Sequence, residues 1–127
     1  MHPGVNILVV DDEEIMRNLF TDILHDEGHQ VTTVCNGKEA QPKVQNSFFD
    51  IAFVDVHMPV MDGIKTLKML REASPDTNIV MMDSLPQYAL DEFIKEGAVS
   101  CIHKPFNITE VRAVVSKIIK KGKPDGQ

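Results

Sequence analysis

The sequence has no tryptophan, one tyrosine and only two cysteines, Cys35 and Cys101. The two cysteines lie far apart and belong to no Cys-x-x-Cys pair, so neither a zinc site nor a thiol redox centre is indicated. We expect both to be buried free thiols. His25 and His29 have the i, i+4 spacing of a helical metal site, but Gly28 should end the helix between them, so we expect no metal there.

Long hydrophobic runs and an excess of positive charge are also missing. No apolar run approaches the roughly 20 residues of a membrane span, and residues 1–4 lack the charged and apolar regions of a signal peptide. With 13 Lys and Arg against 19 Asp and Glu, the net charge is -6, which argues against holding nucleic acid by counterion release. We therefore expect a cytoplasmic protein with neither nucleic acid nor membrane as a direct partner.

What is present is enough apolar material for one core. At 127 residues and 43% hydrophobic content, the chain is of the size and composition of a single domain. We place that domain at residues 1–121. Residues 122–127 contain no apolar side chain, so we expect a disordered tail or the start of a linker.

Short apolar runs rich in β-branched residues alternate with segments of helical period. Strands are predicted at 5–10, 31–34, 51–54, 79–82 and 99–102, and the clearest helices at 14–27, 63–72 and 108–121. In the first helix, Ile15, Leu19, Ile23 and Leu24 are predicted to form the buried stripe. Fivefold alternation of strand and helix predicts an α/β fold with a parallel sheet covered on both faces.

Capping signals mark several helix ends. Asn36 with Glu39, and Asn107 with Glu110, have the spacing of capping boxes. Pro42 falls inside the second helix and removes a backbone donor, so we expect that helix to be kinked or to start late.

Charged residues collect where the predicted strands end. Asp11 and Asp12 follow the first strand, Asp55 follows the third, and Lys104 follows the fifth. Ligands of open parallel sheets bind beyond the carboxyl ends of the strands, so these residues should converge on one rim. Clustered carboxylates recruit a cation, and Mg²⁺ suits them because it takes oxygen ligands. A carboxylate held beside Mg²⁺ and a lysine can form an aspartyl phosphate.

Three segments resemble, in order and spacing, the motifs of the response-regulator receiver domain of two-component signalling. They are ILVVDDE at 7–13, VDVHMPVMDG at 54–63 and KPF at 104–106. The resemblance covers nearly the whole chain and implies a single-domain, flavodoxin-like, doubly wound (βα)5 fold with strand order 2-1-3-4-5. It implies a phosphorelay function with a sensor histidine kinase or histidine phosphotransfer protein as donor, and a downstream protein or output domain as receiver of the signal.

Site roles follow from the resemblance residue by residue. It implies that Asp55 is the phosphoacceptor and that Asp12 binds Mg²⁺ directly. Asp11 would bind Mg²⁺ largely through water, and the backbone carbonyl of His57 would be a further ligand. Lys104 would contact the phosphoryl oxygens, while no chemical role is expected for the His57 imidazole.

The residues of the conformational switch depart from the family. Receivers of this kind usually end the fourth strand with Thr or Ser and carry Tyr or Phe on the fifth. Counting places Asp83 and Cys101 at those positions. An ionised Asp83 should repel a phosphoryl group, so we expect it to turn away, be protonated or meet the metal. Ser84 offers the missing hydroxyl, or caps the following helix.

Two other functions fit parts of the pattern. An aspartate-nucleophile phosphatase of the haloacid-dehalogenase type also places an Asp after an apolar strand, but it would want a second Asp where His57 stands. A receiver fold that is never phosphorylated and only binds proteins is the other alternative. We expect no enzymatic activity beyond assistance of the domain's own phosphorylation and dephosphorylation.

Overall fold

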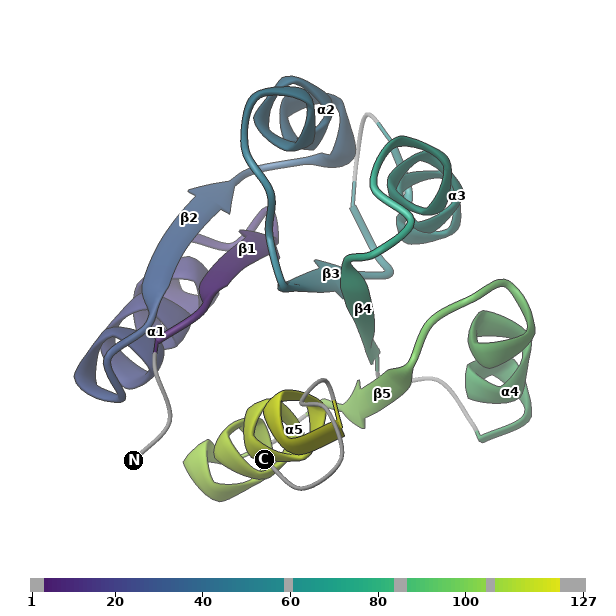
Figure 1. The fold of residues 1–127 in the computed structure, drawn as a ribbon. Helices are drawn as coiled ribbons and strands as arrows, with labels where there is room; N and C mark the ends of the chain where they lie inside the picture. Colours follow the sequence, from purple (N-terminus) through teal and green to yellow (C-terminus); the bar gives the residue numbers. More distant parts are fainter. Residues whose placement is uncertain (1–3, 59–60, 84–86, 105–106, 122–127) are drawn as a thin grey trace.

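The computed structural model describes residues 4–58, 61–83, 87–104 and 107–121, which form a five-stranded parallel sheet with helices on both faces (Figure 1). The strands are β1 (Asn6–Val10), β2 (Gln30–Val34), β3 (Ile51–Asp55), β4 (Asn78–Asp83) and β5 (Ser100–His103). The helices are α1 (Glu14–Asp26), α2 (Gly37–Asn46), α3 (Gly63–Ala73), α4 (Gln87–Lys95) and α5 (Ile108–Lys121).

The strand order is β2-β1-β3-β4-β5, as the family resemblance implied. The chain steps from β1 to β2 in one direction and then from β2 through to β5 in the other. Because parallel crossovers are right-handed, this reversal puts α1 on one face of the sheet and α2, α3 and α4 on the opposite face. Figure 1 shows this division, with α5 returning to the face of α1. The reversal places the switch point between β1 and β3.

The central strands are apolar on both sides, as predicted. Alternate side chains of β1 separate onto the two faces: Leu8 and Val10 join the core beneath α2, α3 and α4, whereas Ile7 and Val9 join the core beneath α1 and α5. β3 is buried along its whole length, because it has a neighbouring strand on each side and helices above and below.

The predicted buried stripe of α1 is half wrong. Ile23 and Leu24 are buried with Phe20, but Ile15 is 81% exposed and Leu19 is also exposed. These two residues precede Leu24 by nine and five positions, which places them about 180° and 140° round the helix from it. Ile15 and Leu19 share the four-residue spacing of Ile23, but the buried face of α1 is centred on Phe20 and Leu24.

Of the two outcomes expected for α2, a kink or a late start, the late start is wrong. The helix begins at Gly37, because the Asn36 side chain accepts the Glu39 N–H at 2.9 Å and the Glu39 carboxylate accepts the Cys35 N–H at 2.8 Å. Pro42 lies within the helix on its exposed side, where water can satisfy the carbonyl that loses its donor. The second capping box is confirmed in part: Asn107 accepts the Glu110 N–H at 2.9 Å.

Cys35 and Cys101 form no disulfide, and they are not both buried. Cys35 is exposed in the loop after the edge strand β2, which contradicts the prediction, and Cys101 is half-buried on β5. Residues 122–127, expected to be a tail, lie outside the described residues.

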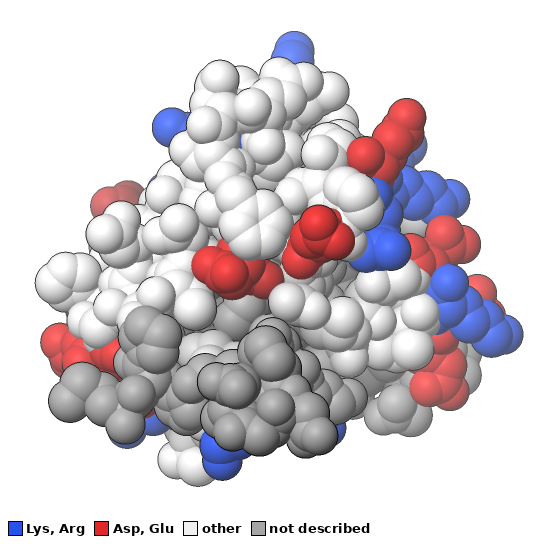
Figure 2. Space-filling view, in the orientation of Figure 1, with Lys and Arg blue, Asp and Glu red and all other residues white. Residues whose placement is uncertain are grey.

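No helix within the described ranges is long and apolar enough to cross a membrane. On the face shown in Figure 2, Lys and Arg side chains are interspersed with Asp and Glu, so its described residues form no continuous basic surface.

Candidate functional site

The predicted acids converge at the carboxyl end of the sheet, at the switch point. Asp11 follows β1, and Asp55 is the last residue of the neighbouring β3. One carboxylate oxygen from each of Asp11, Asp12 and Asp55 lies within 4.8 Å of the others. Asp11 and Asp55 are buried, whereas Asp12 is exposed at the rim.

Lys104 joins this cluster from the far side, immediately after β5. Its Nζ lies 3.4 Å from Asp55 Oδ1, 3.5 Å from Asp11 Oδ2 and 3.6 Å from Glu13 Oε1. The Lys104 backbone N–H donates to the Asp83 carbonyl at 2.7 Å, which continues the β4–β5 pairing and aims the side chain across the sheet end. Glu13 was not predicted as part of the site. Its position directly after Asp11 and Asp12 in the sequence could have indicated that it lies there.

Backbone donors hold the two buried carboxylates in place. The Glu13 N–H donates to Asp11 Oδ1 at 2.9 Å, and the His57 N–H donates to Asp55 Oδ1 at 3.3 Å. Gly63 allows the loop after β3 to fold this tightly, because an added Cβ would lie 2.4 Å from the Cα of Val56. The first turn of α3 is fixed by Asp62, which accepts the Lys65 N–H at 2.9 Å. Pro59, in the same loop, lies outside the described residues.

Burial makes negative charge costly here. Burial raises the pKa of Asp55 to about 6, the Asp11 carboxylate adds to the rise, and Lys104 and the His57 N–H oppose it. Burial also raises the pKa of Asp11. Burial lowers the pKa of Lys104, but Asp11 and Asp55 outweigh it, so the net pKa is raised. At neutral pH a further cation would therefore stabilise the negative charge of these carboxylates.

The donor set fits Mg²⁺. Three carboxylates offer oxygen ligands, and an exposed rim leaves room for the waters that Mg²⁺ retains. Asp11 Oδ2 is buried and accepts no hydrogen bond from the residues that the structure describes, although Lys104 Nζ lies 3.5 Å away. A bound cation would satisfy this oxygen.

Asp83 has a partner that was not predicted. Its carboxylate is fully buried at the end of β4, and Oδ1 lies 3.1 Å from Nε2 of His57, whose side chain is 65% exposed. The His57 imidazole, expected to have no role, therefore contacts the residue at the switch position. The position of His57, two residues after Asp55, predicted a role for its backbone carbonyl but none for its side chain. Ser84, the candidate substitute hydroxyl, lies outside the described residues.

Cys101 occupies the position where an aromatic switch residue is usual, and it packs against the core beneath α2, α3 and α4. Burial raises the pKa of its thiol to about 11, and the nearby Asp83 and Asp91 carboxylates add to the rise. The thiol is thus a small packing group with little thiolate character.

The acids and Lys104 at the end of the sheet surround an open cavity of about 290 Å³. It is lined by Asp12, Glu13, Asp55, His57, Asp83 and Lys104. A cavity of this size, lined by charged and polar residues, accommodates a hydrated cation and a phosphoryl group.

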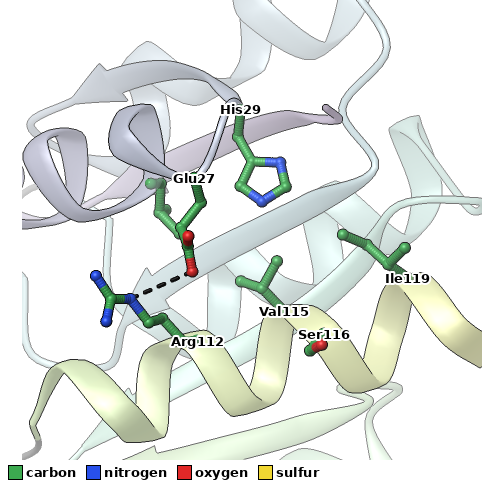
Figure 3. A pocket seen from close by; sticks show the side chains of 7 residues that line it. Glu27, His29, Arg112, Val115, Ser116 and Ile119 are labelled. Atoms are coloured by element: carbon green, nitrogen blue, oxygen red, sulfur yellow. Dashed lines mark ion pairs between the residues drawn. The ribbon is translucent and has the colours of Figure 1, made fainter. Parts of the chain in front are cut away.

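A second pocket, of about 190 Å³, lies between the end of α1 and α5 (Figure 3). Glu27 Oε1 and Arg112 Nε pair there at 3.2 Å. His29 lines the pocket and uses Nδ1 to accept the Val5 N–H at 3.1 Å, and burial lowers its pKa. His29 is therefore a packed histidine that ties the start of β1 to the turn after α1.

Comparison with known proteins agrees with this geometry. The family model of the response regulator receiver domain matches residues 7–116. The chain belongs to this family. The receiver domain is similar to the chemotaxis protein CheY of Thermotoga maritima, at 34% identity over 119 residues, 92% of this chain and 99% of the relative. It is also similar to sporulation initiation phosphotransferase F of Bacillus subtilis, at 32% identity over 89% of this chain and 92% of that relative.

Solved structures show the same fold. The receiver domain of Francisella response regulator 1452 has a TM-score of 0.88 at 28% identity, with 94% of this chain and 100% of that chain covered. Chemotaxis protein CheY4 of Vibrio cholerae has a TM-score of 0.85 at 31% identity, covering 91% of this chain and 98% of the other.

A protein-glutamate methylesterase of Archaeoglobus fulgidus is 35% identical, but the receiver domain covers only 35% of it, so its enzyme name describes a longer protein.

Proposed function

We propose that this receiver domain takes a phosphoryl group on Asp55 in a two-component phosphorelay. The observation that carries the proposal is the contact of Asp55 Oδ1 with Lys104 Nζ at 3.4 Å, beside Asp11 and Asp12 at the switch point of the sheet. A buried carboxylate nucleophile, a lysine and a carboxylate cluster in one cavity are the groups that phosphoryl transfer to an aspartate requires.

The chemistry assigns each residue one task. An Asp55 carboxylate oxygen forms the new P–O bond as the P–N bond of a donor phosphohistidine breaks, and the departing imidazole nitrogen takes a proton from water. Lys104 is placed to contact the transferred oxygens, and the His57 N–H orients the attacking carboxylate. When bound, Mg²⁺ would neutralise charge on the phosphoryl oxygens. Asp12 and Asp55 would hold the ion directly, Asp11 largely through water, and the His57 carbonyl would complete the protein ligands.

A sensor histidine kinase or a histidine phosphotransfer protein is the proposed donor, and a downstream protein or output domain receives the signal. The support is the family match and the similarity to a protein named as a phosphotransferase. We propose that the domain acts in the cytoplasm and turns over no substrate other than its own phosphoryl group.

Intact-mass measurement after incubation with Mg²⁺ and acetyl phosphate tests the proposal. We expect a phosphoryl-sized mass gain in the native protein and in Asp22→Asn, which alters an exposed acid on α1. The gain should be absent in Asp55→Asn. Equal gains in all three proteins, or none in any, would contradict the proposal; absence of any gain would favour a receiver fold that only binds partners.

A further inference from the structure

The pair formed by His57 and Asp83 lies in the same cavity as the proposed phosphoacceptor. Asp83 ends β4 beside β3, and the register pairs its neighbour Met82 with Asp55. The Asp83 carboxylate is fully buried, and His57 reaches it from the loop after β3, with 3.1 Å between Nε2 and Oδ1. Both side chains line the cavity with Asp55 and Lys104.

A buried carboxylate at this position works against binding of a phosphoryl group. Two negative groups in one cavity repel each other, and the cost grows as water is excluded. Lys104 already lies within ion-pair distance of three acids, among them Asp11 and Asp55. A donor on Asp83 therefore changes how much negative charge the cavity presents.

The His57 imidazole supplies such a donor. With a hydrogen on Nε2, the ring can donate to Asp83 Oδ1, because the 3.1 Å between the two atoms is within the range of an N–H···O hydrogen bond. The ring also stands at the cavity mouth, because its side chain is 65% exposed while its partner is buried. It can hold the carboxylate in one orientation without being part of the core.

We propose that His57 is a positioning residue for the phosphoryl site: its imidazole holds the Asp83 carboxylate so that a phosphoryl group can bind at Asp55. This inference depends on the proposed phosphoacceptor function. Its consequence is that residues 57 and 83 act as a unit. The imidazole matters because residue 83 is an acid, and it should cease to matter when that acid is removed.

A double-mutant cycle measures this dependence. The affinity of Mg²⁺-fluoroberyllate, a phosphoryl mimic, is measured by calorimetry for the native protein, His57→Ala, Asp83→Asn and the double variant. We expect His57→Ala to weaken binding about tenfold, the change expected from losing one charge-assisted hydrogen bond. Asp83→Asn should bind at least as tightly as the native protein, and His57→Ala should have little further effect in that background.

Two further variants separate positioning from general damage. His25→Ala makes the same change at an exposed histidine on α1 and should bind like the native protein. His57→Gln retains an N–H donor and should recover part of the lost affinity. In ¹⁹F spectra, His57→Ala should shift a bound-fluoride signal only when residue 83 is Asp, which a purely structural role would not produce. If Asp83→Asn fails to fold, Asp83→Thr completes the cycle.

The outcomes distinguish the two proposals. Equal affinity of the native protein and His57→Ala, or the same loss in both backgrounds, would overturn the role of His57 while leaving Asp55 as phosphoacceptor. Absence of fluoroberyllate binding by the native protein would overturn the phosphoacceptor proposal itself, and the role of His57 with it.

Discussion

The middle of the sheet and its carboxyl end differ in what they contribute to the protein. In the middle, Ile7, Val9 and Phe53 are fully buried among apolar side chains and stabilise the fold. At the carboxyl end, a few residues further along the same strands, Asp11 and Asp55 are equally buried but carry charge. The strands therefore gain stability from their centres and lose some at their ends, where the site lies.

Removing Phe53 should have the largest effect on stability. Its ring packs on Phe20 with 4.9 Å between centroids, and Phe53→Ala leaves a cavity in the core. We expect a loss of about 3–5 kcal/mol in the free energy of unfolding, measured by urea denaturation. Phe48→Ala, at an exposed phenylalanine in the preceding loop, is the matched control and should cost much less. Similar losses in both would contradict the assigned core.

Asp55→Asn should instead increase the free energy of unfolding of the metal-free protein at neutral pH. The pKa of Asp55 is raised from 3.8 to about 6, so its favourable contribution is complete below pH 3.8 and is lost as the pH rises through 6. Above that range the metal-free variant should be more stable than the native protein by about 1–3 kcal/mol.

The pH dependence of that difference is the check. Urea denaturation of both proteins without Mg²⁺ should show it growing between pH 4 and 6 and then levelling. Asp22→Asn, at an exposed acid, should show no such trend. If the difference in free energy of unfolding is constant with pH, or if the native protein is the more stable at pH 8, ionised Asp55 does not destabilise the fold.

Loss of the α3 cap should have a smaller effect. Asp62 accepts the Lys65 N–H at 2.9 Å, so Asp62→Ala should reduce the free energy of unfolding by about 1 kcal/mol. Because the cap fixes the loop between Asp55 and α3, fluoroberyllate affinity should fall as well. Asp76→Ala, at an exposed aspartate before β4, should leave both quantities unchanged. A loss of stability without a change in affinity would show that this loop is positioned by other contacts.

The sheet and the acid cluster were predictable because they depend on local patterns. Apolar runs gave the strands, and parallel strand ends bring Asp11, Asp55 and Lys104 together whatever the details of the loops. The contact of His57 with Asp83 was not predictable, because it depends on how the loop after β3 turns one side chain back over β4.

The remaining errors have separate physical causes. Ile15 was assigned to the core on its four-residue spacing from Leu19 and Ile23, but the buried face of α1 is centred on Phe20 and Leu24, so Ile15 faces solvent. Cys35 was expected to be buried on the general tendency of free cysteines, but it follows an edge strand with solvent beside it. The effect of Pro42 on the start of α2 was overestimated, because the capping box at Asn36 outweighs it.

The most direct test of the contrast between core and site is the stability of the native protein and Asp55→Asn as Mg²⁺ is added at pH 8. Without Mg²⁺ the variant should be the more stable. The native protein should then gain about 1.4 kcal/mol at a Mg²⁺ concentration ten times its dissociation constant, while the variant and Asp12→Ala gain less, so the native and Asp55→Asn curves converge or cross. Parallel curves for all three proteins would contradict a cation site built from Asp12 and Asp55.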